Sequence, residues 1–282
     1  MRRALEKGHN LFDVLQCACL NPVVHYNLPV GLLREGDPAD FIVVDNPTSM
    51  NVLETWINGE RVTSEKTCIL EPKTHSLLNN FNATTRHPSE FSVNAQGKML
   101  RVIEAIEGQL VTGSKIVDAT VVDGLAVADP EKDLLKITVV NRYTDEPPSV
   151  AFIRNFGLKT GAIASTVAHD SHNIIAVGAD DESICKAVNL LVECSGGLSV
   201  ADVNGEMVLS LPIAGLMSDK SCEEVGELYS KIDSRVKQMG CRLRAPYMTL
   251  SFMALLVIPS IKLSDKGLFD GEKFAFTDMW AD

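Results

Sequence analysis

The pattern of apolar and polar positions divides the C-terminal part of the chain into short strands and two amphipathic helices. Short apolar runs bounded by turn residues are typical of strands, and we expect strands at residues 99–106, 116–122, 125–128, 135–140, 162–168, 174–177, 198–203 and 206–211. Two longer runs have apolar residues at helical spacing, with Ile184, Ala187, Val188, Leu191 and Val192 as one buried stripe and Val225, Leu228, Tyr229, Ile232, Val236 and Met239 as the other. Acids at 180–182 and a capping box of Ser221 and Glu224 mark their starts. This order predicts an α+β domain over residues 99–282, with strands and helices packed in layers.

The N-terminal residues predict helices followed by a small β layer. Residues 1–6 have a helical pattern without a capping residue, which favours a piece of a longer protein. A second helix is expected to begin after Asn10, to leave an apolar face exposed on Leu11–Leu20, and to end at Asn21-Pro22. Strands are expected at residues 41–44, 52–57 and 60–62, with Asn58-Gly59 as a hairpin turn. The polar residues 67–98 are interpreted as a connector between residues 1–66 and residues 99–282.

Charge and cysteine usage narrow the class of partner. The 282 residues carry 26 basic and 37 acidic side chains, a formal charge of −11, so there is no electrostatic footprint for nucleic acid or an anionic membrane. No apolar run is long enough to span a bilayer. The seven cysteines form no C-x-x-C pair, which favours a reducing cytoplasm, and Cys17 and Cys19 are expected to pack in a core rather than to bind metal. These features suit a cytoplasmic protein that handles a small molecule.

The sharpest candidate for chemistry is the polar loop His169-Asp170-Ser171-His172-Asn173 between two apolar strands. A strand–loop–strand frame can hold functional groups in place, and imidazoles beside a carboxylate can move protons or bind metal. The alternative is a solvated loop whose polar side chains satisfy their own backbone. Two histidines are too few for a metal site, and no third ligand is obvious nearby.

Two further segments carry polar residues beside apolar ones. Residues 212–219 end a predicted strand in a glycine-containing turn, so Met217, Ser218 and Asp219 can face a substrate, or can serve as a turn and a helix cap. Residues 248–253 place hydroxyls within an apolar stripe and are expected to form a core helix. The chain lacks a phosphate-binding G-x-x-x-x-G-K-[ST] loop, a G-x-S-x-G elbow, an H-E-x-x-H motif and the H-x-H of barrel metallohydrolases.

Several stretches, in this order, resemble the C-terminal portion of the adenine deaminase family of the amidohydrolase superfamily. They are GAIASTVAHDSHN at 161–173, PIAGLMSDK at 212–220, MTLSF at 248–252 and GLFD at 267–270. The residues NPVVHY at 21–26 and GDPADFIVV at 36–44 resemble the last barrel helix of an amidohydrolase and its return into a flanking β-sandwich. The resemblance implies that residues 1–66 are a remnant of that barrel helix and small β-sandwich, followed by the layered α+β C-terminal domain.

The reaction that the resemblance implies is the hydrolysis of adenine to hypoxanthine and ammonia, a step of purine salvage. Hydroxide on manganese or iron attacks C6 of the purine, and a carboxylate moves the proton to the leaving amine. The family's metal ligands come from an H-x-H and from later barrel strands that have no counterpart here, and His25 does not match a ligand position. We therefore expect this chain to bind no metal and to be inactive alone.

Two hypotheses follow for the function. In the first, the chain is part of an adenine deaminase whose other part, the missing N-terminal barrel, is its partner and whose substrate is adenine. His169, Asp170 and His172 are then candidate catalytic residues, and Ser171, Asn173, Met217, Ser218 and Asp219 candidate substrate-binding residues. In the second, the chain is a non-catalytic binding or oligomerisation module derived from that domain. A homo-oligomer is expected in either case.

Overall fold

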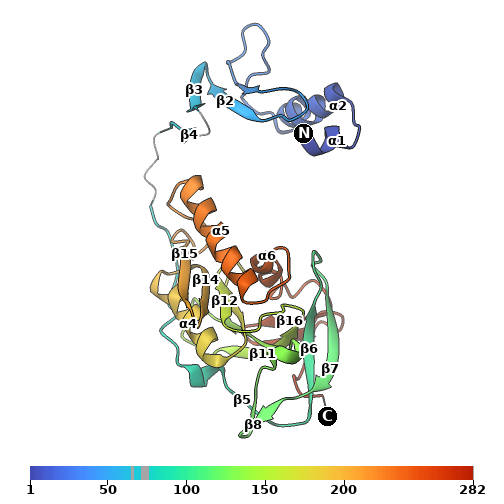
Figure 1. Cartoon of the computed structure of the whole chain (residues 1–282), viewed down its shortest axis with the longest axis vertical. Coiled ribbons are helices and arrows are strands. Elements are labelled where there is room, and N and C mark those ends of the chain that lie inside the picture. Colours follow the sequence, from blue (N-terminus) through green and yellow to red (C-terminus); the bar gives the residue numbers. More distant parts are fainter. Residues whose placement is uncertain (65–66, 71–75, 282) are drawn as a thin grey trace. The chain divides into compact units, whose positions relative to one another are not determined.

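The computed structural model describes residues 1–64, 67–70 and 76–281, and the chain divides into two compact units, residues 1–74 and 75–282. Unit 1 begins with four consecutive helical segments: α1 (Arg2–Glu6), α2 (Leu11–Leu15), the π-helical turn η1 (Gln16–Leu20) and α3 (Asn21–Tyr26). A four-stranded sheet follows in the order β1 (Phe41–Val44), β2 (Val52–Ile57), β3 (Glu60–Ser64) and β4 (Thr67–Cys68). Figure 1 shows both units in sequence colours.

The helix expected to end at Asn21-Pro22 does not end there. Proline lacks an N–H and its ring clashes with the carbonyl four residues earlier. The chain widens into a π-helical turn immediately before Pro22, with the Asn21 N–H bonded to the carbonyl of Gln16, and helix α3 continues to Tyr26. The prediction of a helix end at this proline was therefore wrong.

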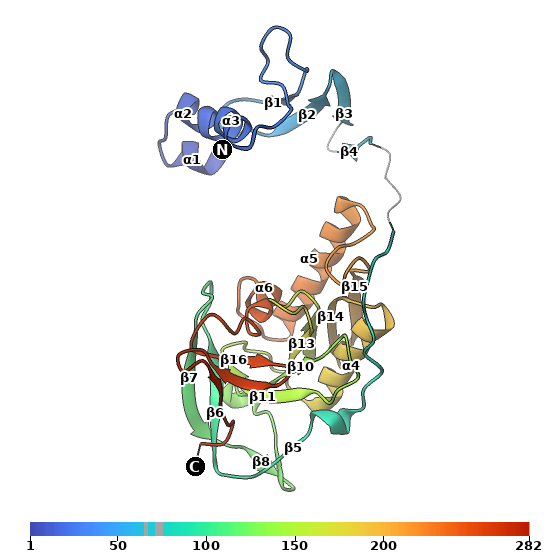
Figure 2. The same ribbon diagram turned by 180° about the vertical axis from the view of Figure 1, so that it is seen from behind.

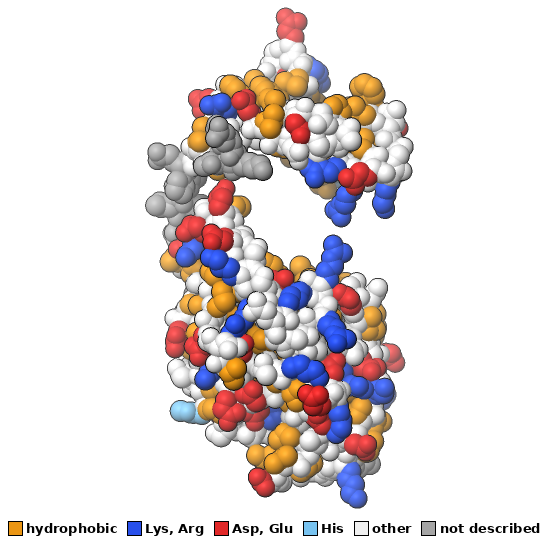
Figure 3. Space-filling model, viewed as in Figure 1, with side chains coloured by type: hydrophobic (Ala, Val, Ile, Leu, Met, Phe, Trp, Pro, Cys, Tyr) orange, Lys and Arg blue, Asp and Glu red, His pale blue; other side chains and the backbone are white. Residues whose placement is uncertain are grey.

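The apolar face expected on Leu11–Leu20 is exposed only in part in unit 1, because Leu11, Val14 and Leu15 are half-buried. Phe12 is 76% exposed and Leu20 is 41% exposed, and Figure 3 shows hydrophobic side chains on the surface of this unit. Cys17 and Cys19 are also exposed, so the prediction that they pack in a core was wrong. None of the residues in the four helical segments is buried in unit 1, so this part of the chain has no helical core for the two thiols to join.

The hairpin turn at Asn58-Gly59 is confirmed. Both residues have positive φ, 51° and 79°, as the two central positions of a type I′ turn require. The Asp40 carboxylate braces this turn, because it accepts hydrogen bonds from the backbone N–H of Asn58 and of Gly31.

Unit 2 is built on an eight-stranded sheet in the order β15-β14-β12-β13-β10-β11-β6-β7. Neighbouring strands are antiparallel except β11 and β6, which are parallel. In chain order the strands are β6 (Met99–Ala105), β7 (Thr112–Asp118), β10 (Leu135–Val140), β11 (Ser149–Arg154), β12 (Ala162–Ser165), β13 (Ile174–Gly178), β14 (Gly197–Asp202) and β15 (Gly205–Ser210).

Hydrophobic clusters cover both faces of this sheet, because alternate residues of a strand point to opposite faces, and a third, smaller cluster lies around Leu100, Val102 and Phe152. Helix α4 (Asp181–Glu193) packs with Ala162, Ala164 and Ala176 on one face. Helices α5 (Cys222–Gln238) and α6 (Pro246–Ser251) pack with Ile163 and Ile175 on the other. The hairpin of β16 (Ile261–Ser264) and β17 (Gly267–Asp270), which pairs with β18 (Ala275–Phe276), joins this second core beside β10 and β11 (Figure 2). The α+β fold class predicted from the sequence is confirmed.

Short elements complete unit 2 around its edges. They are the 3-10 turns η2 (Pro88–Phe91) and η3 (Pro130–Lys132) and the small sheet of β5 (Val93–Asn94), β9 (Leu125–Ala126) and β8 (Val121–Val122). Residues 79–91, part of the segment interpreted as a connector, lie against α4: Asn79 donates to the Ser195 carbonyl, and Phe91 is fully buried in the α4 core. Within the described residues, no helix is long and apolar enough to cross a membrane.

The amphipathic helices of unit 2 agree with their sequence signals, and several strands do not. The capping box is present, with Ser221 Oγ accepting from the Glu224 N–H and the Glu224 carboxylate accepting from the Ser221 N–H. The strand expected at 116–122 is instead split between β7 and β8, and β11 carries no counterpart among the predicted strands. Strand β12 ends at Ser165 rather than at Ala168, which lengthens the loop that follows.

Candidate functional site

The loop between β12 and β13 is anchored at several points in unit 2. Thr166 is fully buried, and its hydroxyl donates to the Gly215 carbonyl at 2.6 Å while accepting from the Gly197 N–H at 2.8 Å. The His169 N–H donates to the Ser251 carbonyl at the end of α6, at 2.9 Å. Because β14, the 212–217 turn and α6 all hold it, this loop is a fixed part of the fold.

The two histidines of the loop lie in different surroundings. The His169 ring stacks on Phe252, with centroids 4.9 Å apart and planes 19° from parallel, and its centroid lies 5.6 Å from that of His172. His172 has a left-handed backbone, φ 53°, and its Nδ1 is buried without a hydrogen-bond partner. Burial, followed by the positive charges of His169 and Arg142, lowers the pKa of His172 below its ordinary value of 6.5, against an opposing effect of Asp170. His172 is therefore a neutral imidazole at pH 7, and unlike His169 it does not line the cavity described below.

The segment that follows β10 holds the same loop from its other side. The Arg142 N–H donates to Asn173 Oδ1 at 3.2 Å, and the Tyr143 hydroxyl donates to the Ser171 carbonyl at 2.8 Å. The Arg142 guanidinium, on a side chain only 5% exposed, donates to the Ala214 carbonyl at 2.6 Å and to the Tyr143 hydroxyl at 2.9 Å. The buried guanidinium of Arg142 thus connects the loop of residues 166–173, called the histidine loop below, to the 212–217 turn.

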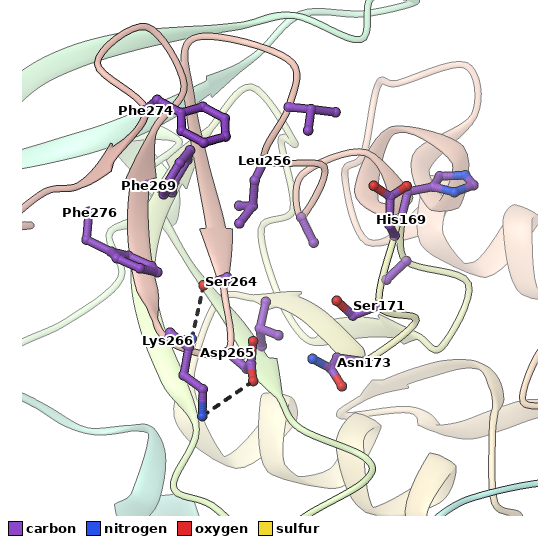
Figure 4. A pocket seen from close by; sticks show the side chains of 15 residues that line it. His169, Ser171, Asn173, Leu256, Ser264, Asp265, Lys266, Phe269, Phe274 and Phe276 are labelled. Carbon is purple, nitrogen blue, oxygen red and sulfur yellow. Dashed lines mark hydrogen bonds and ion pairs between the residues drawn. The ribbon is translucent and has the colours of Figure 1, made fainter.

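A cavity of about 410 Å³ opens beside the loop, within the usual range of about 300–1,000 Å³ for small-molecule sites. Its polar lining includes His169, Asp170, Ser171, Asn173, Asp265 and Lys266. Its apolar lining includes Ala254, Leu256, Val257 and the three aromatic rings of Phe269, Phe274 and Phe276. In Figure 4, Ser171 and Asn173 point toward the side of Asp265 and Lys266, whereas the ring of His169 turns away from them. The cavity therefore offers a polar end and an aromatic wall to a planar molecule.

The second predicted group of site residues does not join this cavity. Met217 is 55% exposed, the Ser218 hydroxyl accepts from the Lys220 N–H at 3.2 Å, and Asp219 is exposed. None of the three lines the cavity beside the histidine loop. The turn that precedes them does reach the loop, through Arg142 and Thr166.

Sequence reasoning missed three residues that organise the site. Asn141 and Arg142 follow β10, whereas Asp265 lies in the turn between β16 and β17. Asn141 donates to Asp265 at 2.8 Å across 124 positions. The available signal was weak: a polar Asn-Arg-Tyr run directly after the apolar strand 135–140, and an acid in a hairpin turn. Only pairing of distant strands brings these residues to the loop.

The described residues around the cavity do not form a metal site. Within the part of the chain that the structure describes, no group of three or more His, Cys, Asp or Glu side chains is placed to hold a metal ion. The pair His169 and His172 lacks a third ligand, which a protein metal site ordinarily needs. These residues therefore do not fit the metal centre that the family resemblance implies.

Comparison with known proteins places both units. The amidohydrolase family model matches residues 1–62, and the model of the adenine deaminase C-terminal domain matches residues 109–275, which include the histidine loop and every residue that lines its cavity except Phe276. The fold and these matches define the class as an α+β protein related to the amidohydrolases. Within that class, the chain belongs to the adenine deaminase family.

Curated relatives agree along the whole chain. An adenine deaminase of Salinibacter ruber is 52% identical over 284 residues, covering 100% of this chain and 52% of the relative. Those of Methanosarcina acetivorans and Borreliella burgdorferi are 47% and 44% identical, covering 100% and 98% of this chain and 53% and 51% of the relatives. The chain spans about half the length of the curated relatives it matches.

Proposed function

We propose that this chain is the C-terminal part of an adenine deaminase and that its histidine loop forms one side of the adenine pocket. The observation that carries the proposal is the family match over residues 109–275, which contains the loop and all but one of the residues that line the cavity of about 410 Å³. The reaction is the hydrolysis of adenine to hypoxanthine and ammonia, in which water replaces the amino group at C6. The relatives named for this activity are about twice as long as the chain.

The loop residues divide the work by their surroundings. His172 does not line the cavity, but its ring lies 5.6 Å from that of His169, which does, so its proposed part in proton transfer is indirect. His169 and Asp170 line the cavity and bring an imidazole and a carboxylate to it, while Ser171 and Asn173 provide hydrogen bonds to the purine. Met217, Ser218 and Asp219, on the neighbouring exposed turn, contact substrate only if the remaining half of the enzyme closes over that turn.

The metal-dependent step is not assigned to residues of this chain, because the described residues do not form a metal site. We propose that the partner is a metal-bearing barrel, corresponding to the part of the relatives that this chain does not span. Residues 1–66 then belong with that barrel as its last helix and β-sandwich return. This chain alone, supplied with Mn²⁺ or Fe²⁺, is expected to give no hypoxanthine above a metal-only blank, and clear turnover would contradict this division of labour.

The test is a chimera in which this chain replaces the corresponding half of the Salinibacter ruber relative, with which it is 52% identical. His169→Ala and His172→Ala are expected to lower kcat/KM by about 10²–10⁴-fold, the usual contribution of a group that transfers a proton. His87→Asn, on the exposed η2 turn, is the matched control and should leave kcat/KM unchanged.

Thermal unfolding separates catalysis from support. Lost turnover with an unchanged Tm upholds the proposal. Intact specific activity with a lowered Tm would instead make the loop a structural part of a supporting or oligomerisation module.

A further inference from the structure

The amide of Asn141 fixes an acceptor on one side of the cavity. Asn141 Oδ1 accepts from the N–H groups of Tyr143 and Thr144, at 2.8 and 3.2 Å, so the other end of the amide must be the donor. That donor, Nδ2, bonds to Asp265 Oδ2 at 2.8 Å, and Lys266 Nζ lies 3.9 Å from the same oxygen. Among the described residues, Asp265 Oδ1 has no hydrogen-bond partner, and Asp265 lines the cavity. The turn between β16 and β17 thus presents a held carboxylate with one oxygen free.

The amide of Asn173 fixes a donor on the facing side in the same way. Its Oδ1 accepts from the Arg142 N–H, so Nδ2 is the end that remains. Asn173 is only 5% exposed, and within the described part of the chain its Nδ2 has no hydrogen-bond partner. Figure 4 shows this nitrogen directed across the cavity toward Asp265. This N–H donor has no partner among the described side chains and is accessible from the cavity, so it is available to an acceptor there.

The rest of the cavity suits a flat, apolar ring system. The rings of Phe274 and Phe276 each meet Phe269 edge-on at 5.4 Å between centroids, and they are 73% and 58% exposed. Aromatic rings of this kind stack on heterocyclic bases without preference for one base over another. Any discrimination must then come from the polar pair at the other end.

We propose that Asn173 and Asp265 together recognise the N3/N9–H edge of adenine and so select the free base over its nucleoside. Asn173 Nδ2 donates to N3, and Asp265 Oδ1 accepts from N9–H. The donor and the acceptor of the protein thus match the acceptor and the donor on this edge of adenine. A purine substituted at N9 has no proton to give to the carboxylate and places a bulky group against it.

The choice of edge rests on the proposed function. An adjacent donor and acceptor also occur on the two edges of adenine that include the 6-amino group. Deamination requires C6 to face the other half of the enzyme. N3 lies across the six-membered ring from C6, so only the N3/N9–H edge can face Asn173 and Asp265 while C6 is left open.

The test measures binding of adenine analogues to the chain alone, by calorimetry and ligand-observed NMR, and needs no metal and no turnover. Adenine, N6-methyladenine and 7-deazaadenine are expected to bind alike, because their N3/N9–H edge is intact. The analogues 9-methyladenine and 3-deazaadenine are expected to bind at least about tenfold more weakly, since each loses a hydrogen bond to the site, the first to a charged group.

Asp265→Asn is the informative variant. Its amide keeps the shape of the side chain and can still accept from Asn141, but its other end becomes a donor that opposes N9–H. Adenine should bind at least about tenfold more weakly to this variant, and the distinction between adenine and 9-methyladenine should disappear. Asp123→Asn, which removes the same charge from an exposed turn, is the control and should bind adenine as the unmodified chain does.

Two results would overturn the assignment: equal binding of adenine and 9-methyladenine, or no adenine binding at millimolar concentration. Loss of binding by N6-methyladenine alone would also overturn it, because the amino edge would then face the pair. If the chimera loses activity on substitution of His172 but the chain fails the analogue-binding test, the proposed function stands and the Asn173–Asp265 assignment falls. If the chain passes the binding test but the chimera does not need the histidines, the assignment stands and the proposed function of the histidine loop falls.

Discussion

Replacement of Arg142 by methionine tests whether one buried cation organises the site. Arg142 is 5% exposed, and within the described residues it forms no ion pair with an acid; its guanidinium is held by the Ala214 carbonyl and the Tyr143 hydroxyl. A hydrogen bond from a charged donor contributes about 1.5–3 kcal/mol. Ala214 and Tyr143 are only partly buried and can bind water in the variant, so we take the lower value for both bonds. The expected loss is about 3 kcal/mol, or about 6–12 °C in the Tm of a unit of this size.

The same substitution should change the titration of His172. The positive charge of Arg142 is one cause of its lowered pKa, after burial and the charge of His169. In Arg142→Met this pKa should rise toward, but not reach, 6.5, because burial remains the largest cause. A histidine with a lowered pKa destabilises the folded state as pH falls below 6.5, since the unfolded chain takes up the proton first. That acid-side loss of stability should therefore shrink in the variant.

The assay combines thermal unfolding with an NMR titration of the histidine ring protons. Arg242→Met is the control, because Arg242 is exposed, and its effect should stay within about 0.5 kcal/mol. A variant at Arg142 as stable as the unmodified chain, or one with an unshifted His172, would refute the role given to this guanidinium.

Three other substitutions test the packing of unit 2. Gly215→Ala should lower the Tm, because φ is +68° and a Cβ would lie 2.1 Å from Arg142 Nη1, and an unchanged Tm would show that the guanidinium is not held there. Gly226→Ala, at an exposed position inside α5 where a Cβ meets nothing within 4 Å, should raise stability by about 0.5–1 kcal/mol, and a loss would contradict the open space at that position. Burial of Lys262, which donates to the Leu110 carbonyl, lowers its pKa from 10.5 to about 8. Stability should therefore rise by about 3 kcal/mol between pH 8 and 10.5, and Lys262→Met, compared by denaturant unfolding, should abolish that rise; an identical slope in both proteins would disprove it.

Local signals predicted most of the elements because their causes lie within a few residues. The capping box at Ser221, the turn at Asn58-Gly59 and the stripe of α4 all act over one turn of helix or one hairpin. The predicted helix end at Pro22 was wrong because the π-helical turn at Gln16–Leu20 changes the hydrogen bonding of the five preceding residues, so the helix can continue past the proline. Strand β11 was missed because its identity depends on the neighbours β10 and β6 that pair with it.

The sequence by itself determined the α+β class, the family and the polar loop at 169–173, because apolar periodicity and short motifs are written along the chain. Only the tertiary structure decided what that loop meets. Arg142 and Asp265 reach it through strand pairing and through a hydrogen bond spanning 124 positions, contacts that no local pattern encodes. The free Nδ2 of Asn173 exists for the same reason: the backbone N–H of Arg142, in the segment that follows β10, occupies the other end of its amide.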